Sequence, residues 1–166
     1  MRTRRFCLSA LALFGATSLS ACGFTPMYGE ASPANQLSDI LIETGEERVD
    51  FYLQEALKDA LNARNADGPY ILRTQTRRQR VGLGVSTDEE ARRYAVRIIV
   101  SYELIRDEFS EPVMTGSAEA EAGFNAPDEI FSIEIAERDA ELRAAEAVAE
   151  RIQIQLYRFA AGNDAW

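Results

Sequence analysis

Residues 92–105 alternate between two kinds of side chain, and this alternation constrains the fold more than any other feature. One set of alternate positions is aliphatic or aromatic throughout: Tyr94, Val96, Ile98, Val100, Tyr102 and Leu104. Because successive side chains of a strand point to opposite faces of a sheet, the pattern predicts a long strand with one core face and one mixed face. Residues 70–81 have the same period. The glycines and polar residues of VGLGVSTDEEA, which lies between the two segments, predict a hairpin connection.

Two amphipathic helices are predicted outside this hairpin. In the first, Thr44 followed by Glu47 matches a capping box. Apolar residues then recur at helical spacing: Val49, Leu53, Ala56, Leu57, Ala60 and Leu61. This helix is expected to end near Asp67-Gly68-Pro69, because glycine and proline do not continue a helix.

The second predicted helix is longer and runs from about Ile133 to Phe159. Its apolar stripe comprises Ala136, Ala140, Ala144, Ala147, Val148, Ile152, Leu156 and Phe159. Charged residues lie on the opposite side: Glu137, Arg138, Glu141, Glu150 and Arg158. The pattern predicts a helix that packs on the core through one face and is solvated on the other.

Two further strands are predicted, at residues 37–43 and 113–122. The second of them carries the small residues Gly116, Ala118 and Ala120 on one face, which allows a helix to pack closely. The predicted order is strand, helix, three strands and helix. This order predicts an α+β fold, with two helices packed on one face of a small, largely antiparallel sheet of about four strands.

The N-terminal segment has the anatomy of a secretory signal peptide. A basic head with three arginines precedes a short apolar run, and the small residues Ser20 and Ala21 follow. The order Leu-Ser-Ala-Cys resembles a bacterial lipobox, in which the cysteine thiol is acylated and becomes the first residue. We therefore expect residues 1–21 to be a signal peptide, Cys22 to be the lipid attachment site, residues 22–36 to be a tether and residues 37–166 to form one domain. The alternative is a plain signal peptide cut near Ala21, which would leave Cys22 as a lone thiol.

Composition excludes several functional classes. The chain contains no histidine, so it lacks the commonest general base and the commonest metal ligand. Its only lysine is Lys58, and no cluster of cysteines or histidines has metal-ligand spacing. Without the signal arginines, 15 basic residues stand against 27 acidic ones, which argues against nucleic-acid binding. We predict a protein that is not an enzyme and that holds no metal or cofactor.

Arginines are concentrated on the predicted hairpin of this acidic chain. The candidate binding residues are Arg77, Arg78, Arg80, Arg92 and Arg93. Guanidinium groups bind phosphates and carboxylates through paired hydrogen bonds, so the cluster is suited to an anionic ligand. It is equally suited to protecting an edge strand, since charge discourages the addition of another strand.

Several of these features together resemble a known family. The lipobox is followed by CGFTPMYG, residues 22–29, and the long terminal helix contains Glu137-Arg138-Asp139-Ala140. With the order of strands and helices, these segments resemble the LptE lipoproteins of lipopolysaccharide assembly, of the alphaproteobacterial type. The resemblance covers essentially the whole chain.

The resemblance implies a function in the cell outer membrane. LptE proteins are lipid-anchored partners of the outer-membrane β-barrel LptD; they plug its lumen, assist its folding and bind lipopolysaccharide on its way to the outer leaflet. The expected partners are thus an LptD-like barrel, lipopolysaccharide and the membrane itself, through acyl chains on Cys22. The five hairpin arginines are our candidates for lipopolysaccharide binding; they are equally candidates for docking on acidic residues of the barrel lumen.

Two other functions remain open from the sequence. An outer-membrane lipoprotein that binds or activates a periplasmic cell-wall enzyme would have the same anchor, tether and domain. A periplasmic lipid carrier would need an apolar cavity, which strand alternation does not reveal.

Overall fold

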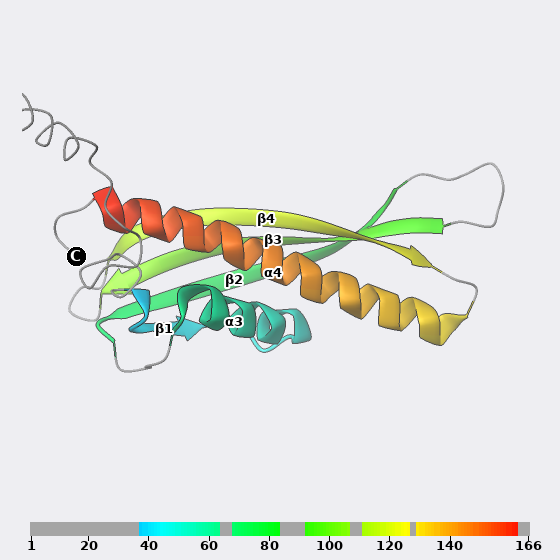
Figure 1. The fold of residues 1–166 in the computed structure, drawn as a ribbon, viewed down its shortest axis with the longest axis horizontal. Helices are drawn as coiled ribbons and strands as arrows, with labels where there is room; N and C mark the ends of the chain where they lie inside the picture. The colour runs from blue at the N-terminus through cyan, green and yellow to red at the C-terminus, as the bar shows by residue number, and fades with distance from the viewer. Residues whose placement is uncertain (1–36, 64–67, 84–91, 107–110, 127–128, 163–166) are drawn as a thin grey trace, which may run out of the picture. The chain divides into compact units, whose positions relative to one another are not determined.

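The computed structural model describes residues 37–63, 68–83, 92–106, 111–126 and 129–162 (Figure 1). All described residues belong to one compact unit within Pro33–Trp166. The predicted signal peptide, Cys22 and the tether lie outside the described residues. Within those residues, no helix is both long enough and apolar enough to cross a membrane.

The described chain forms a four-stranded sheet and two helices. The elements are β1 (Ile40–Glu43), α3 (Arg48–Leu61), β2 (Tyr70–Gly82), β3 (Arg92–Arg106), β4 (Pro112–Ala126) and α4 (Ile130–Gly162). The strand order is β1-β2-β3-β4, with β1 parallel to β2 and the other neighbours antiparallel. The predicted α+β class and largely antiparallel sheet are confirmed.

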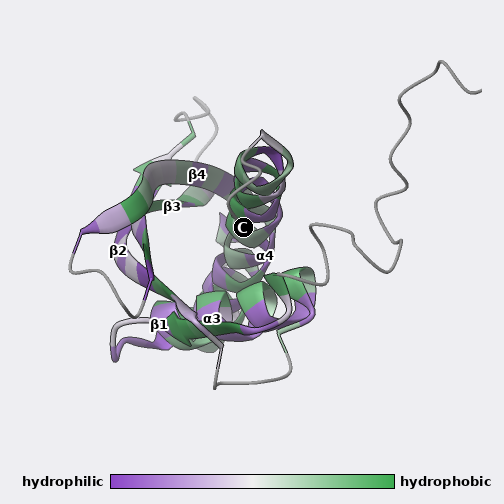
Figure 2. Cartoon of the chain, turned by 90° about the vertical axis from the view of Figure 1, so that its left-hand side faces the viewer, coloured by the Kyte–Doolittle hydropathy of each residue, from purple (hydrophilic) through white to green (hydrophobic). Residues whose placement is uncertain are grey.

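One face of the sheet is buried, and it is the face that the alternation predicts. Its core side chains come from even-numbered positions of β2, β3 and β4: Tyr70, Leu72, Val96, Ile98, Val100, Tyr102, Leu104, Ala118, Ala120, Ala122 and Phe124. The sheet curls around this face, which α3 and α4 cover (Figure 2). The small residues of β4 bring α4 close, as expected.

The boundaries of α3 differ from the prediction. Its capping-box pair is Glu47 with Asp50, rather than Thr44 with Glu47, and the Asp50 carboxylate accepts the Glu47 backbone N–H at 3.1 Å. The helix ends at Leu61, because Asn62 adopts the left-handed conformation with φ of 52°. Asparagine can take this conformation as glycine does, so the helix stops before the Gly-Pro pair that sequence patterns favour as its end.

One side of α4 also differs from the prediction. The core stripe is confirmed at Ala140, Ala144, Val148, Ile152 and Leu156, whereas Ala136, Ala147 and Phe159 are only partly buried. Glu141, predicted on the solvated face, is 1 % exposed, and Glu137 is half-buried. Arginines from other elements form ion pairs with both carboxylates and so compensate their lost hydration.

A tyrosine joins β3, β4 and α4. Gly116 lies opposite Tyr102 in the register, and a Cβ at Gly116 would lie 2.5 Å from Cζ of the Tyr102 ring. Because Gly116 has no side chain, the phenol reaches across β4 and donates a hydrogen bond to Gln155 Oε1 at 2.6 Å. Burial raises the pKa of the Tyr102 phenol.

Candidate functional site

The structure separates the five predicted binding arginines. Side chains of Arg78 and Arg80 lie on the helix-covered face of β2, whereas Arg77 lies on the open face. Arg93 is exposed and lies opposite Asn125, near the start of β3. Arg92 is the first residue of β3, and its side chain lies outside the described part. Arg77 pairs with Ile99, six residues along β3 from Arg93, so the two exposed arginines are separated by roughly 20 Å at about 3.4 Å per residue.

Arg78 and Arg80 belong to an ion-pair network between β2 and the two helices. Arg78 contacts both Glu137 and Glu141, and Arg80 contacts Glu137 at 3.3 Å. Arg48, at the start of α3, donates two hydrogen bonds to Glu141, at 2.9 and 3.0 Å. A buried carboxylate is tolerated only where charge and hydrogen bonds compensate its lost hydration, and these arginines supply both.

Aromatic rings complete the surroundings of Arg80. Its guanidinium carbon lies 4.2 Å from the centre of the Tyr94 ring and 5.4 Å from that of Phe124, and the two rings stack on each other. A guanidinium over an aromatic face is stabilised by the negative charge of the ring face. Arg78 and Arg80 are therefore already engaged in holding α4 against the sheet.

The open face of the sheet carries paired and unpaired arginines. Arg73 pairs with Glu43 at 3.1 Å, and Arg97 pairs with Glu121 at 2.9 Å. Arg77 and Arg93 form no ion pair with any residue that the structure describes. Among the side chains of the predicted cluster that the structure describes, these two carry charges that are available to an anionic ligand or partner.

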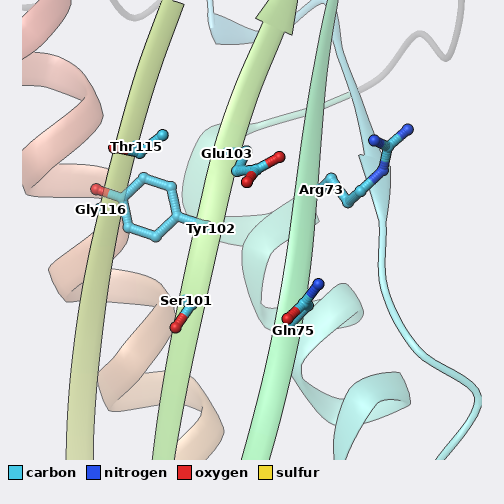
Figure 3. Close-up of a pocket in the computed structure, with 7 residues that line it drawn as sticks. All are labelled: Arg73, Gln75, Ser101, Tyr102, Glu103, Thr115 and Gly116. Carbon is cyan, nitrogen blue, oxygen red and sulfur yellow. The ribbon is translucent and has the colours of Figure 1, made fainter. Parts of the chain in front are cut away.

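A shallow depression lies on the same open face. Its lining residues are Arg73, Gln75, Ser101, Tyr102, Glu103, Thr115 and Gly116, from three neighbouring strands (Figure 3). Nearly all of these side chains are polar, and both signs of charge are present. The depression therefore offers hydrogen-bonding groups to a ligand or partner.

The first turns of α4 expose an apolar patch that sequence reasoning missed. Ile130, Phe131 and Ile135 are 81 %, 82 % and 69 % exposed. The signal in the sequence was the apolar pair directly before Ser132, which precedes the predicted start of the helix. Among the described residues, no group of acidic, cysteine or histidine side chains could hold a metal ion.

Comparison with known proteins identifies the family. A family model described as LptE, lipopolysaccharide-assembly, matches residues 35–156. The chain belongs to the LptE family. The matched span includes β1 to β4, α3 and most of α4, so it includes every strand of the sheet and the arginine network of this LptE-family protein.

Solved structures of lipoproteins have the same fold. A candidate lipoprotein from Caulobacter crescentus CB15 is 26 % identical, covers 81 % of this chain and 100 % of its own, and superimposes with a TM-score of 0.69. A minor lipoprotein from Acinetobacter baumannii is 15 % identical, covers 72 % of this chain and 90 % of its own, and has a TM-score of 0.58. No curated protein sequence matches the chain significantly.

Proposed function

We propose that this LptE-family protein is an outer-membrane lipoprotein that plugs an LptD-like β-barrel, assists its assembly and binds lipopolysaccharide for delivery to the outer leaflet. Family membership over residues 35–156 is the observation that carries the proposal. Acyl chains on Cys22 provide the anchor. Two or three chains hold a protein firmly at a membrane, whereas a single chain holds it only marginally.

The open face of the sheet supports the plug. Polar side chains predominate there: Arg73, Gln75, Arg77, Gln79, Arg97, Ser101, Glu103, Thr115, Ser117, Glu119 and Glu121. The interior of an outer-membrane barrel is polar, so a domain enclosed by it needs an exterior that makes hydrogen bonds. The depression next to Tyr102 adds donors and acceptors from three strands to this surface.

The five arginines have two roles in this proposal. Arg77, Arg92 and Arg93 make the first contacts with lipopolysaccharide phosphates, because the charges of Arg77 and Arg93 are unpaired among the described residues. Arg78 and Arg80 maintain the site by fixing α4 on the sheet. The Glu137 and Glu141 carboxylates occupy the positions at these two guanidinium groups that a phosphate would otherwise take. A ligand would have to displace them.

Site-specific photo-cross-linking in cells tests the plug. A photoreactive residue at the exposed position Ser101 is expected to cross-link to a large β-barrel protein, and the full-length lipoprotein is expected to co-purify with that barrel in mild detergent. The Cys22→Ser variant, which cannot be acylated, is expected to lose the cross-link. Recovery of a periplasmic cell-wall enzyme in place of the barrel would contradict the proposal.

A further inference from the structure

The backbone groups at the two edges of the sheet differ in their hydrogen-bond partners. Leu83 donates its N–H to the Arg93 carbonyl, so odd-numbered residues of β2 and β3 form the hydrogen bonds between these two strands. Even-numbered residues of β3 and β4 then form the hydrogen bonds between β3 and β4. Odd-numbered residues of β4 therefore direct their backbone groups to its free edge. Two of those carbonyls accept side-chain hydrogen bonds from α4: Gly123 from Arg143 at 3.0 Å, and Ser117 from Gln155 at 3.1 Å.

At the opposite edge, no described side chain donates a hydrogen bond to a backbone carbonyl of residues 76–82. β1 pairs with residues 70–73 of β2 only, so the rest of β2 has β3 as its single neighbour among the described strands. Because odd-numbered residues of β2 form the hydrogen bonds to β3, even-numbered residues of β2 direct their N–H and C=O groups away from β3. The open edge of β2, residues 76–82, thus presents the backbone groups of Thr76, Arg78, Arg80 and Gly82 over roughly 20 Å, at about 3.3 Å per residue.

An unsatisfied hydroxyl lies at the start of this open edge. The Thr74 hydroxyl donates to the Glu43 carbonyl, the last residue of β1, at 3.3 Å. Two residues along β2, the buried Thr76 hydroxyl has no hydrogen-bond partner in the described structure. Residues 44–47 of this chain follow Glu43 and lead into α3, and the Thr76 hydroxyl is buried, so an added strand has to lie beyond it along β2.

Charge defines which strand would fit. The edge segment bears Arg77, Arg78 and Arg80, of which Arg77 is exposed and forms no ion pair with a described residue. A carboxylate on the neighbouring strand beside Arg77 would match this charge, whereas a basic side chain would be repelled. A second copy of β2 would bring like charges together, so the edge disfavours self-association.

We propose that the open edge of β2 binds an extended, acidic segment of another polypeptide, which adds to the sheet as a new strand beside the outer part of β2. Backbone hydrogen bonds to Arg78, Arg80 and Gly82 give affinity, and a carboxylate beside Arg77 gives selectivity. The same arginines that protect the edge from most strands would then select the partner. Strand addition does not require lipopolysaccharide, although both ligands would contact Arg77.

Methylated peptides test the proposal with the full-length protein in detergent. The probe is a fluorescent seven-residue peptide that alternates valine and glutamate, with binding measured by anisotropy. N-methylation of alternate residues removes the hydrogen-bond donors from one edge of the peptide strand only. Methylation of one set of alternate residues is expected to weaken binding at least tenfold, and methylation of the other set is expected to leave it unchanged. Binding of the peptide is expected to slow hydrogen exchange at residues 76–82.

Charge variants provide the control. Arg77→Glu is expected to weaken binding of the glutamate peptide at least tenfold and to favour the corresponding lysine peptide. Arg151→Glu, which makes the same charge change on an exposed position of α4, is expected to leave both unchanged. Equal binding of the two methylated peptides, absence of binding, or protection of β2 by self-association alone would overturn the proposal.

Discussion

The ring of Tyr102 lies across Gly116 of the neighbouring strand, and its hydroxyl bonds to Gln155 of α4. Gly116→Ala is therefore expected to lower the free energy of unfolding by about 1–3 kcal/mol, the usual cost of overpacking a core. Gly123→Ala is the control in the same strand, because a Cβ there would meet its nearest atoms at 3.7 Å. Urea denaturation of both variants measures the difference. Equal stability of the two variants would show that the ring moves aside without cost.

The buried phenol predicts a dependence of stability on alkaline pH. Since the Tyr102 pKa is raised in the folded state, folding favours the protonated phenol. This contribution is complete below the ordinary tyrosine pKa of about 10 and is lost as the pH rises through the higher folded pKa. Above pH 10, the wild type is expected to lose stability more steeply than Tyr102→Phe, by up to about 1.4 kcal/mol per pH unit. An equal change in the free energy of unfolding of the two proteins between pH 9 and pH 11.5 would contradict this prediction.

The Glu141 carboxylate is expected to be the critical member of the ion-pair network. Glu141→Ala leaves Arg48 and Arg78 without their shared partner, and both are partly solvated. The expected loss is about 2–3 kcal/mol, below the 3–5 kcal/mol typical of fully buried pairs. Glu134→Ala removes an exposed pair with Arg138 on the same helix and is expected to cost less than about 1 kcal/mol. Denaturation midpoints of the two variants compare them, and equal losses would contradict the assignment.

The two roles of the arginines predict separable effects on lipopolysaccharide binding. The Arg77→Gln/Arg93→Gln variant is expected to bind about tenfold more weakly, equivalent to about 1.4 kcal/mol, with unchanged folding stability. Its binding should also depend less on salt, because screened charge contacts have been removed. The Arg151→Gln/Arg158→Gln variant has the same net charge and is expected to bind as the wild type does.

The complementary variant tests the structural role of the other two arginines. Arg78→Gln/Arg80→Gln is expected to lower the unfolding midpoint, since Glu137 loses both of its arginine partners and Glu141 keeps only Arg48 among the described residues. Loss of lipopolysaccharide binding in this variant with unchanged stability would show that Arg78 and Arg80 contact the ligand directly.

Much of the architecture could be predicted from periodicity. Alternation over residues 94–104 defines β3 and its core face without knowledge of its neighbours, because a period of two is a property of a single strand. The small residues of β4 likewise indicate the position of α4. The same period of two places Arg78 and Arg80 on one face of β2 and Arg77 on the other, as they lie in the structure.

The partners of the charged residues could not be predicted in this way. Glu137 and Glu141 were expected to be solvated because they were placed on the side of the predicted helix opposite its apolar stripe. Their compensation comes from Arg48 and from β2, which are distant in sequence. Helix periodicity reports which side chains are apolar, but it does not report which charges are matched across the fold.

Depletion of the protein followed by membrane fractionation tests the central claim most directly. If the chain is the plug and assembly partner of an outer-membrane barrel, the correctly folded form of that barrel and surface lipopolysaccharide are expected to fall together. Re-expression of the wild type restores both, and Cys22→Ser does not. An unchanged barrel with unchanged surface lipopolysaccharide would contradict the account.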